Sequence, residues 1–383
     1  MNILVIVQEI GDNAAGLVTE NLLKGWFNSN NDIRVICKSN ANKSFSTDAI
    51  VKVNEMIPQR SAIGKILMIL TTKEWSVRRW VKKAMVTYEK VFFEFKPQVV
   101  LAMSSAANFA SFDLGYRISK KYHIPLALHA FDPIPSTIGW GENKYYRRAM
   151  ASCVKPFYNH STWISSTNQS MLNYQLDTVG IRDNKVTFVI ENPSDQTHYN
   201  LNETAKNFNF VYLGNLYNKR NPQILINAFS DYCIENPSAH LFFVGKVSSN
   251  LTINIPIDAR NNIHFEDWTD SPQKYIEQAS VLIDIDADLE NDVFISSKLT
   301  NYLGINRLIL CITPPNSPAS QLLATIGNSV LGCNNEELLI LKALKDCESK
   351  STSTLSYKDR KEVRNRLKVE TIIKKWTSYL NGQ

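Results

Sequence analysis

The sequence predicts an α/β protein with two Rossmann-like, doubly wound domains, each built on a parallel β-sheet. Short apolar runs of strand length alternate with helical segments in both halves of the chain. These runs are apolar throughout, which is typical of parallel strands covered by helices on both faces. With 383 residues, of which 44% are hydrophobic, the chain is long enough for two such domains.

The first half contains the pattern once and the second half repeats it. In the first half we expect strands at 1–7, 33–37, 97–102, 124–129, 162–165 and 186–190, with a helix at 108–121. In the second half we expect strands at 208–213, 241–244, 263–265, 281–286 and 308–312, and helices at 224–232, 275–279, 336–347 and 359–380. Asn192-Pro193 ends the last strand of the first half, because proline fixes the turn, and it marks the domain boundary.

Residues 73–95 are expected to form one long amphipathic helix. Val77, Trp80, Val81, Ala84, Met85 and Tyr88 follow the helical period, whereas Lys73, Arg78, Arg79, Lys82 and Lys83 share the other side. The first 195 residues carry 23 Lys and Arg against 16 Asp and Glu, and the rest carry 19 against 20. The basic side of this helix is either a solvated face over a buried stripe or, together with residues 144–148, a surface for an anionic membrane.

Cysteine usage and hydropathy favour a cytoplasmic protein, and peripheral association with the inner face of the membrane is compatible with this location. The six cysteines are scattered without a CxxC pair, as expected for reduced thiols. The apolar run at residues 1–7 is short and lacks a basic segment before it, so we interpret it as a strand and not as a signal peptide. No apolar run reaches the length of a membrane-spanning helix.

The segment 288–315 joins two apolar strands through a loop and a short helix, which makes a βαβ unit. Ser296 and Ser297 are suited to cap that helix, and Lys298 and Asn301 follow in its first turns. A capped helix start beside a lysine can hold a phosphate. The plain alternative is an ordinary capped helix.

Three further segments offer ligand-binding residues. The basic turn after strand 208–213 contains Asn215, Lys219 and Arg220, and a guanidinium binds phosphate oxygens bidentately. Gly16 lies in a turn of small residues after the first strand, and Trp268 follows strand 263–265. Each of these segments can also be an ordinary surface turn.

His129 and Asp132 follow a strand at the sheet edge where ligands of open α/β folds bind, so they are candidate acid/base residues. A histidine in such a place can equally be a hydrogen-bonded structural residue. Asp284, Asp286 and Asp288 alternate at the end of another strand. Carboxylates can bind Mg²⁺, but no histidine completes a site, and we interpret these residues as structural or sugar-facing.

The segment ISSKLTNYLG…RLILCITP is similar to the donor-binding segment of glycosyltransferase family 4, which has the GT-B fold. Ser297, Lys298, Tyr302 and Leu303 match its motif, Asn301 replaces a ribose-binding Glu, and a partner acid falls on Val293, next to Asp292. GNLYNKRNP resembles a second motif of the family, with Asn215 at an Arg position and Arg220 at a Lys position. His129 resembles a family histidine near the donor sugar, and Asn192-Pro193 with Asp195 resembles the hinge.

The resemblance implies domains at 1–193 and 194–361 facing across a cleft, with a C-terminal helix at about 362–383 that returns to the first domain. It implies a retaining, metal-independent hexosyltransferase without a cofactor. Such an enzyme moves a sugar from a nucleotide-diphospho-sugar to a saccharide or lipid-linked acceptor in surface polysaccharide or glycolipid synthesis.

Two alternatives stay open at this point. The first is a sugar-nucleotide epimerase of the same fold, which would need a carboxylate pair in its cleft. The second is a nucleic-acid-binding protein that uses the basic first half. No recognition motif accompanies those charges, so we expect no nucleic-acid partner.

Overall fold

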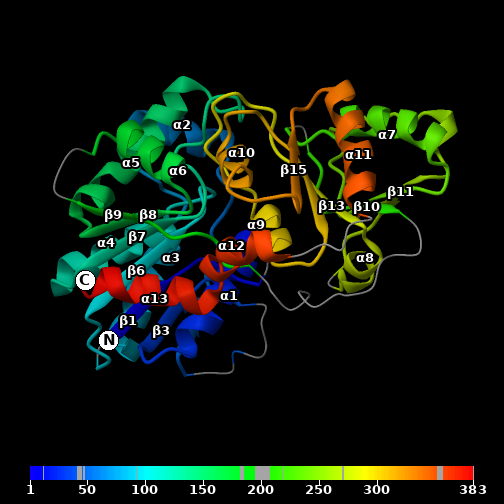
Figure 1. Ribbon diagram of the computed structural model, residues 1–383. Coiled ribbons are helices and arrows are strands. Elements are labelled where there is room, and N and C mark those ends of the chain that lie inside the picture. Colours follow the sequence, from blue (N-terminus) through cyan, green and yellow to red (C-terminus); the bar gives the residue numbers. More distant parts are fainter. Residues whose placement is uncertain are drawn as a thin grey trace. The chain divides into compact units, whose positions relative to one another are not determined.

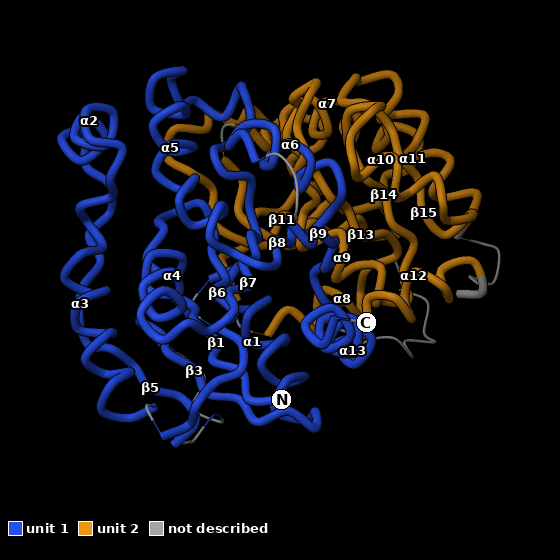
Figure 2. Tube along the Cα trace, turned by 90° about the vertical axis from the view of Figure 1, so that its left-hand side faces the viewer, with its two compact units in different colours: residues 1–193, 369–383 blue, residues 194–368 orange. Residues whose placement is uncertain are grey.

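The computed structural model describes residues 1–11, 13–40, 45, 48–92, 94–181, 185–194, 208–217, 219–269, 271–351 and 357–382. It divides into two compact units, shown in Figure 2: unit 1 is Met1–Pro193 with Val369–Gln383, and unit 2 is Ser194–Lys368. The chain leaves unit 1 at the predicted residue 193 but returns to it at Val369, not at about 362. Asp195 lies outside the described residues.

Unit 1 is built on a seven-stranded parallel sheet (Figure 1), as the apolar runs predict. Across the sheet the strands are β5 (Ile50–Lys52), β3 (Asp32–Cys37), β1 (Asn2–Ile6), β6 (Val99–Ser104), β7 (Leu126–Ala130), β8 (Trp163–Ser166) and β9 (Val186–Val189). A separate two-stranded pair joins β2 (Glu9–Ile10) to β4 (Ser39–Asn40). The central strand β6 is buried at every position, which explains its uninterrupted apolar sequence.

Helices cover both faces of this sheet, and the sheet separates two hydrophobic cores. They are α1 (Ala14–Phe27), α2 (Ala62–Thr71), α3 (Arg78–Thr87), α4 (Ala110–Tyr122), α5 (Lys144–His160), α6 (Gln169–Val179) and α13 (Val369–Leu380). Asparagine side chains cap three of them, α1, α5 and α6, by accepting a hydrogen bond from a backbone N–H in the first turn.

The long helix expected at 73–95 is wrong in its extent. Helix α3 begins only at Arg78 and continues after Thr87 into a π-helical turn, Tyr88–Phe92. The preceding segment is the connection from α2, whose C-cap Thr72 has a left-handed φ of +51°, and Glu74 in this connection forms a buried ion pair with Arg60. The buried stripe of α3 is as expected, with Trp80, Val81 and Ala84 in the core.

Unit 2 repeats the architecture with a six-stranded parallel sheet. Its strands across the sheet are β12 (Ile263–Glu266), β11 (His240–Val244), β10 (Asn209–Leu213), β13 (Val281–Ile285), β14 (Leu308–Ile312) and β15 (Val330–Cys333). Its helices are α7 (Gln223–Glu235), α8 (Gln273–Gln278), α9 (Ser297–Leu303), α10 (Pro318–Leu323), α11 (Glu337–Ser351) and α12 (Lys361–Arg366), with 3₁₀ turns at Ile257–Ala259 and Tyr357–Arg360.

The helix expected at 359–380 is two helices that belong to different units. Helix α12 ends before Leu367 in unit 2, and α13 begins at Val369 in unit 1. In unit 1, α13 lies beside α1 (Figure 1) and buries Ile372, Ile373 and Trp376 in the core. None of the helices in the described part of the chain has the length and apolar character to cross a bilayer.

Candidate functional site in unit 2

Two buried aspartates at the carboxyl end of β13 form the base of the site. Asp284 is the fourth residue of β13 and Asp286 directly follows the strand. Ser296 Oγ donates a hydrogen bond to Asp284 Oδ1 at 3.2 Å, and Thr313 Oγ1 donates to Asp286 Oδ2 at 3.1 Å. Burial, reinforced by the charge of Asp284, raises the pKa of Asp286 to about 7. Asp286 therefore holds a proton part of the time at neutral pH.

Lys298 places an ammonium group beside these carboxylates. It lies in the first turn of α9, and its Nζ is 4.0 Å from Asp284 Oδ1 and 5.4 Å from the centre of the Tyr212 ring. Burial, together with the nearby charge of Arg220, lowers the pKa of Lys298 to about 8. The lysine is still mostly charged at neutral pH, but it loses its proton at a lower pH than a lysine in water.

Gly214 makes room for this lysine. Its φ is +145°, and a Cβ atom at this position would lie 2.7 Å from Lys298 Cδ. Any side chain would therefore be strained in its backbone and would push Lys298 away. The glycine that ends β10 is thus a requirement of the site.

Arg220 is the second cation of the site and is 4% exposed. Its Nε and Nη2 atoms have no hydrogen-bond partner among the described residues. Tyr217 and Phe294 lie with their ring centres 5.6 Å from its Cζ. Burial opposes the charged form, but attraction to Tyr217 and Asp284 outweighs it, so the pKa of Arg220 is raised and the guanidinium stays charged.

A buried guanidinium with unpartnered N–H groups is costly for a protein that has nothing else to bind. Such groups lose their water without replacement and cost about 1–3 kcal/mol each. They are therefore exceptions that need an explanation, and an anionic ligand supplies one. The structure brings Arg220 and Lys298 together as electrostatic neighbours at the strand ends, where ligands of parallel sheets bind.

The other predicted donor residues in unit 2 occupy different places. Asn215 is exposed, and its Oδ1 accepts a hydrogen bond from Lys246 N at 3.1 Å, so it shapes a loop. Lys219 is partly buried in the turn before Arg220, and Asn301 is partly buried on α9. Trp268 is 51% exposed after the edge strand β12, two strands from β10.

Of the two serines, Ser296 has a defined structural role. It is the N-cap of α9, and its Oγ accepts a hydrogen bond from Lys298 N at 3.2 Å while donating to Asp284. This pair of bonds links the helix to the carboxylate end of β13. Ser297, the first residue of α9, is partly buried.

In unit 1, Gly16 lies in the first turn of α1, and its N–H donates to Asn13 Oδ1 at 2.9 Å. The adjacent cavity, lined by Gln8, Glu9 and Phe131 among others, measures about 20 Å³. A cavity of that size holds a water molecule and not a sugar or a phosphate group. The structure thus shows a packed turn at Gly16.

His129, the predicted acid/base residue, is buried in the core of unit 1. It is 1% exposed, its Nδ1 lies 2.9 Å from Ser165 Oγ, and its ring contacts Phe131 and Trp376 edge-on. Burial lowers its pKa to about 3, so the ring is neutral at pH 7. Asp132 is partly buried, and its backbone carbonyl accepts a hydrogen bond from Gln175.

Asp284 and Asp286, interpreted from the sequence as structural or sugar-facing, are the electrostatic counterparts of Arg220 and Lys298. The signal was present, because a strand as apolar as 281–285 has no structural need for a buried carboxylate. Thr313 after the neighbouring strand β14 is a second such signal, because its hydroxyl binds Asp286.

Comparison with known proteins gives a fold-level answer. No family model matches the chain, and no curated protein matches it by sequence. Among solved structures, HepE from Anabaena in complex with UDP and glucose has a TM-score of 0.66 at 12% identity, covering 100% of both chains. Sucrose-phosphate synthase from Thermosynechococcus elongatus has a TM-score of 0.71 at 11% identity, covering 100% of this chain and 98% of that one.

A third match belongs to a different enzyme class. A putative UDP-N-acetylglucosamine 2-epimerase from Listeria monocytogenes has a TM-score of 0.58 at 9% identity, covering 100% of this chain and 97% of that one. The matches span both units and both parallel sheets of the chain. The protein therefore has the two-unit α/β fold of the GT-B glycosyltransferases.

Proposed function

We propose that the protein is a glycosyltransferase that uses a nucleotide-diphospho-sugar, with Arg220 and Lys298 holding the donor diphosphate in unit 2. The single observation that carries this proposal is the buried Arg220, whose Nε and Nη2 have no partner among the described residues. A diphosphate supplies oxygen acceptors that match a guanidinium. The likeness to HepE, which was crystallised with UDP and glucose, supports a uridine nucleotide.

The two cations would act mainly on the leaving group. As the bond between the sugar and the diphosphate breaks, negative charge accumulates on the phosphate oxygens. Arg220 and Lys298 are already positioned by buried contacts, so they would stabilise that charge with little rearrangement. We propose that transfer proceeds without a metal ion, because these cations already provide the positive charge. The resemblance of residues 295–304 to a retaining family supports retention of configuration.

We further propose a hexose as the transferred sugar and a saccharide or lipid-linked acceptor, in polysaccharide or glycolipid synthesis. The basic surface of unit 1 supports an acceptor at an anionic membrane. Arg78, Arg79, Lys82 and Lys83 are all exposed on α3. We therefore expect a cytoplasmic protein that associates peripherally with the inner face of the membrane.

The test is donor binding followed by transfer. Melting temperatures are measured with UDP-glucose, UDP-galactose, UDP-N-acetylglucosamine, GDP-mannose and CMP-sialic acid, and the stabilising donor is then tested for sugar transfer to lipid extracts and oligosaccharides. A ligand at about 100 times its Kd stabilises the folded protein by about 2.7 kcal/mol. Absence of stabilisation by every nucleotide sugar contradicts the proposal.

An epimerase is the second candidate, favoured by the match to the putative UDP-N-acetylglucosamine 2-epimerase. It is distinguished by incubating the protein with UDP-N-acetylglucosamine and no acceptor. Appearance of a C2 epimer in the proton NMR spectrum identifies an epimerase. A glycosyltransferase leaves the donor unchanged until an acceptor is added.

A further inference from the structure

Helix α2 directs most of its large apolar side chains away from the protein. Ile63, Ile66, Leu67 and Leu70 are 70%, 56%, 39% and 75% exposed. Their spacing of three, four and seven residues places them on one face of the helix. Helices of soluble proteins normally bury such a stripe. We call these four residues the apolar stripe of α2.

The opposite face of α2 is attached to unit 1. Met68 is 1% exposed and belongs to the hydrophobic core, and α2 packs along α5, as Figures 1 and 2 both show. The helix is therefore docked through one side and presents its more apolar side outward. Lys65 interrupts this outer surface, with its Nζ 5.4 Å from the centre of the Tyr146 ring.

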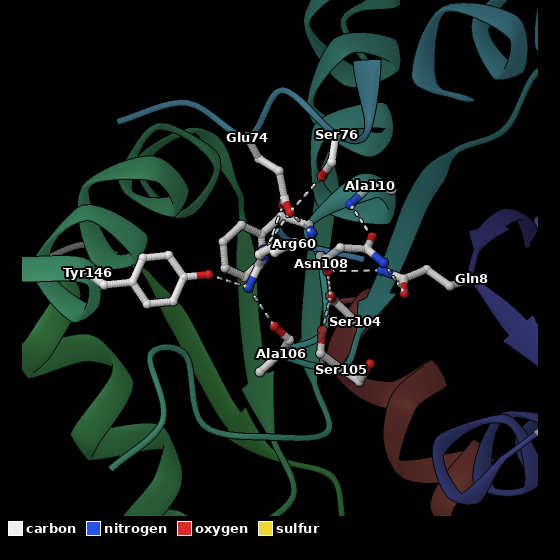
Figure 3. Close-up of polar contacts among 11 residues, drawn as sticks. Gln8, Arg60, Glu74, Ser76, Ser104, Ser105, Ala106, Asn108, Ala110 and Tyr146 are labelled. Atoms are coloured by element: carbon white, nitrogen blue, oxygen red, sulfur yellow. Dashed lines mark hydrogen bonds and ion pairs between the residues drawn. The ribbon is translucent and has the colours of Figure 1, made fainter. Parts of the chain in front are cut away.

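A buried polar cluster fixes both ends of α2 (Figure 3). Arg60 precedes the helix and Glu74 follows it, and their side chains form an ion pair with Nε 2.6 Å from Oε1. Glu74 Oε2 also accepts a hydrogen bond from Phe109 N at 2.8 Å, and Arg60 Nη1 donates to Ala106 O at 3.1 Å. The outward orientation is thus built into the structure of unit 1, because these bonds close the segment into a loop with α2 at its middle.

The surroundings of the apolar stripe are strongly basic. Residues 56–88 contain seven Lys and Arg and one acidic residue, Glu74. Arg60 and Glu74 neutralise each other in the buried ion pair, which leaves six cations, and Lys83 among them lies 3.6 Å from Glu55. Trp75 is 42% exposed, its Nε1 donates to Thr71 Oγ1 at 3.0 Å, and Arg78 Cζ lies 3.3 Å from the centre of its ring. Apolar side chains, an exposed tryptophan and cations together are the composition of helices that lie in a membrane surface.

We propose that α2 docks unit 1 onto an anionic lipid bilayer, with the apolar stripe inserted between the lipids and the cations of α2 and α3 at the headgroups. A helix of 10 residues is about 15 Å long and too short to span the hydrocarbon core, so it lies in the plane of the surface. A second copy of the chain is a poorer occupant. A symmetric contact through this surface would bring the same cations face to face.

This inference deepens the proposed function, since a lipid-linked acceptor resides in a membrane, but its test requires no donor. The full-length protein is floated with vesicles of phosphatidylcholine containing 30% phosphatidylglycerol, and the variant Ile63→Ser/Leu70→Ser is compared with it. The matched control is Ile234→Ser/Leu338→Ser in unit 2, which replaces apolar residues of similar exposure, 73% and 80%. All four side chains are exposed, so neither variant should lose folding stability.

The wild type and the control should float, and the α2 variant should bind at least about 100-fold more weakly, since each fully inserted aliphatic side chain contributes about tenfold. Binding should also fall in vesicles of phosphatidylcholine alone and at high salt. Failure of the wild type to float overturns the proposal, and so does equal flotation of the α2 variant. Self-association that is lost in the α2 variant, without lipid binding, overturns it in favour of a dimer contact. Donor stabilisation is measured on the same samples, so a failure of the glycosyltransferase proposal is recognised separately.

Discussion

Replacing Arg220 by methionine should abolish donor binding without destabilising unit 2. The same replacement at Arg360 should destabilise unit 2 without affecting donor binding. Both arginines are buried, at 4% and 0% exposure. Arg360 Nη2 donates to Arg307 O at 2.8 Å and its Nη1 to Tyr302 O at 3.4 Å, so this guanidinium fastens the chain. Two nitrogens of Arg220, Nε and Nη2, have no hydrogen-bond partner among the described residues. The pair therefore separates a ligand-binding arginine from a structural one.

The magnitudes follow from these contacts. Arg360→Met removes the side-chain donor to the Arg307 carbonyl, whereas the Tyr302 carbonyl keeps its hydrogen bond from Ile305 N. The loss of about 1–3 kcal/mol should lower the melting temperature by about 2–12 °C. Arg220→Met removes a guanidinium whose charge is balanced by nearby Asp284 and Asp286 but whose Nε and Nη2 make no hydrogen bond among the described residues. Asp286 can take up a proton to compensate, so the ligand-free melting temperature should change little. Loss of one charge-assisted phosphate contact costs about 2–4 kcal/mol, which weakens donor binding about 30- to 1000-fold.

The assay is thermal unfolding of both variants over a titration of UDP-glucose, or of the donor that stabilises the wild type most. The Arg360 variant should melt early but gain the same stabilisation from donor as the wild type. The Arg220 variant should melt normally and gain almost none. An Arg220 variant that unfolds like the Arg360 variant, or one that binds donor normally, refutes the assignment of Arg220 to the ligand.

Three further outcomes are expected. First, affinity for UDP-glucose should fall as the pH rises from 6 to 9, because Asp286 with a pKa of about 7 becomes negative and Lys298 with a pKa of about 8 becomes neutral. Isothermal titration calorimetry at several pH values measures this affinity. The Asp286→Asn variant should lose the part of the decrease that occurs near pH 7. Because the pKa of Asp286 is raised by folding, its contribution to stability is complete at low pH and is lost as the pH rises through about 7, so Asp286→Asn should stabilise the free protein more at pH 8 than at pH 5 in urea unfolding. Second, His129→Ala should destabilise the protein by about 2–4 kcal/mol, as large-to-small core substitutions do, yet leave the Kd for UDP-glucose unchanged; a weakened Kd in a folded variant would return His129 to the site. Third, Gly214→Ala should cost about 1–3 kcal/mol of backbone strain and also weaken donor binding by displacing Lys298, whereas Gly64→Ala, in a roomy helical position, should do neither.

The architecture was largely predictable because parallel strands buried on both faces leave a simple trace in the sequence. The apolar runs at 99–104, 281–285 and 308–312 are strands in the structure, and every strand of both large sheets pairs in parallel. The helix expected at 73–95 was wrong at its start. The helical period begins only at Val77, and the preceding residues 72–76 form the connection from α2, with Thr72 in a left-handed conformation and Glu74 held in a buried ion pair.

Helix α2 shows a second limit of the sequence pattern. Hydrophobic periodicity reveals that a helix has an apolar face but not what that face contacts. In residues 62–71 nearly every position is apolar, so neither side is marked as the one that faces the protein. Only the structure shows that Met68 is buried and that the stripe containing Leu70 is exposed.

The sequence predicted where the candidate site residues lie in the fold, but not how they are buried or whether their polar atoms are hydrogen-bonded. His129 lies near the carboxyl end of β7 and Arg220 lies in the turn after β10, so the sequence predicts both at the carboxyl edge of a sheet. The structure buries both, but the His129 ring has a hydroxyl partner at Ser165 and aromatic neighbours, whereas two nitrogens of Arg220 have no hydrogen-bond partner in the part of the chain that the structure describes. Whether a buried polar group is satisfied depends on contacts from distant segments, which a single sequence does not contain.

The four charges of unit 2 explain why such a site can exist before any ligand arrives. Arg220 and Lys298 alone would repel each other in a buried place, and Asp284 and Asp286 reduce that repulsion. A diphosphate must then compete with these carboxylates for the cations. Because Asp286 has a pKa of about 7, it can take up a proton as the negative ligand enters. The neutral carboxyl group then no longer attracts the cations. In this arrangement Asp284 balances the cations while the site is empty, and protonation of Asp286 leaves their positive charge available to the ligand.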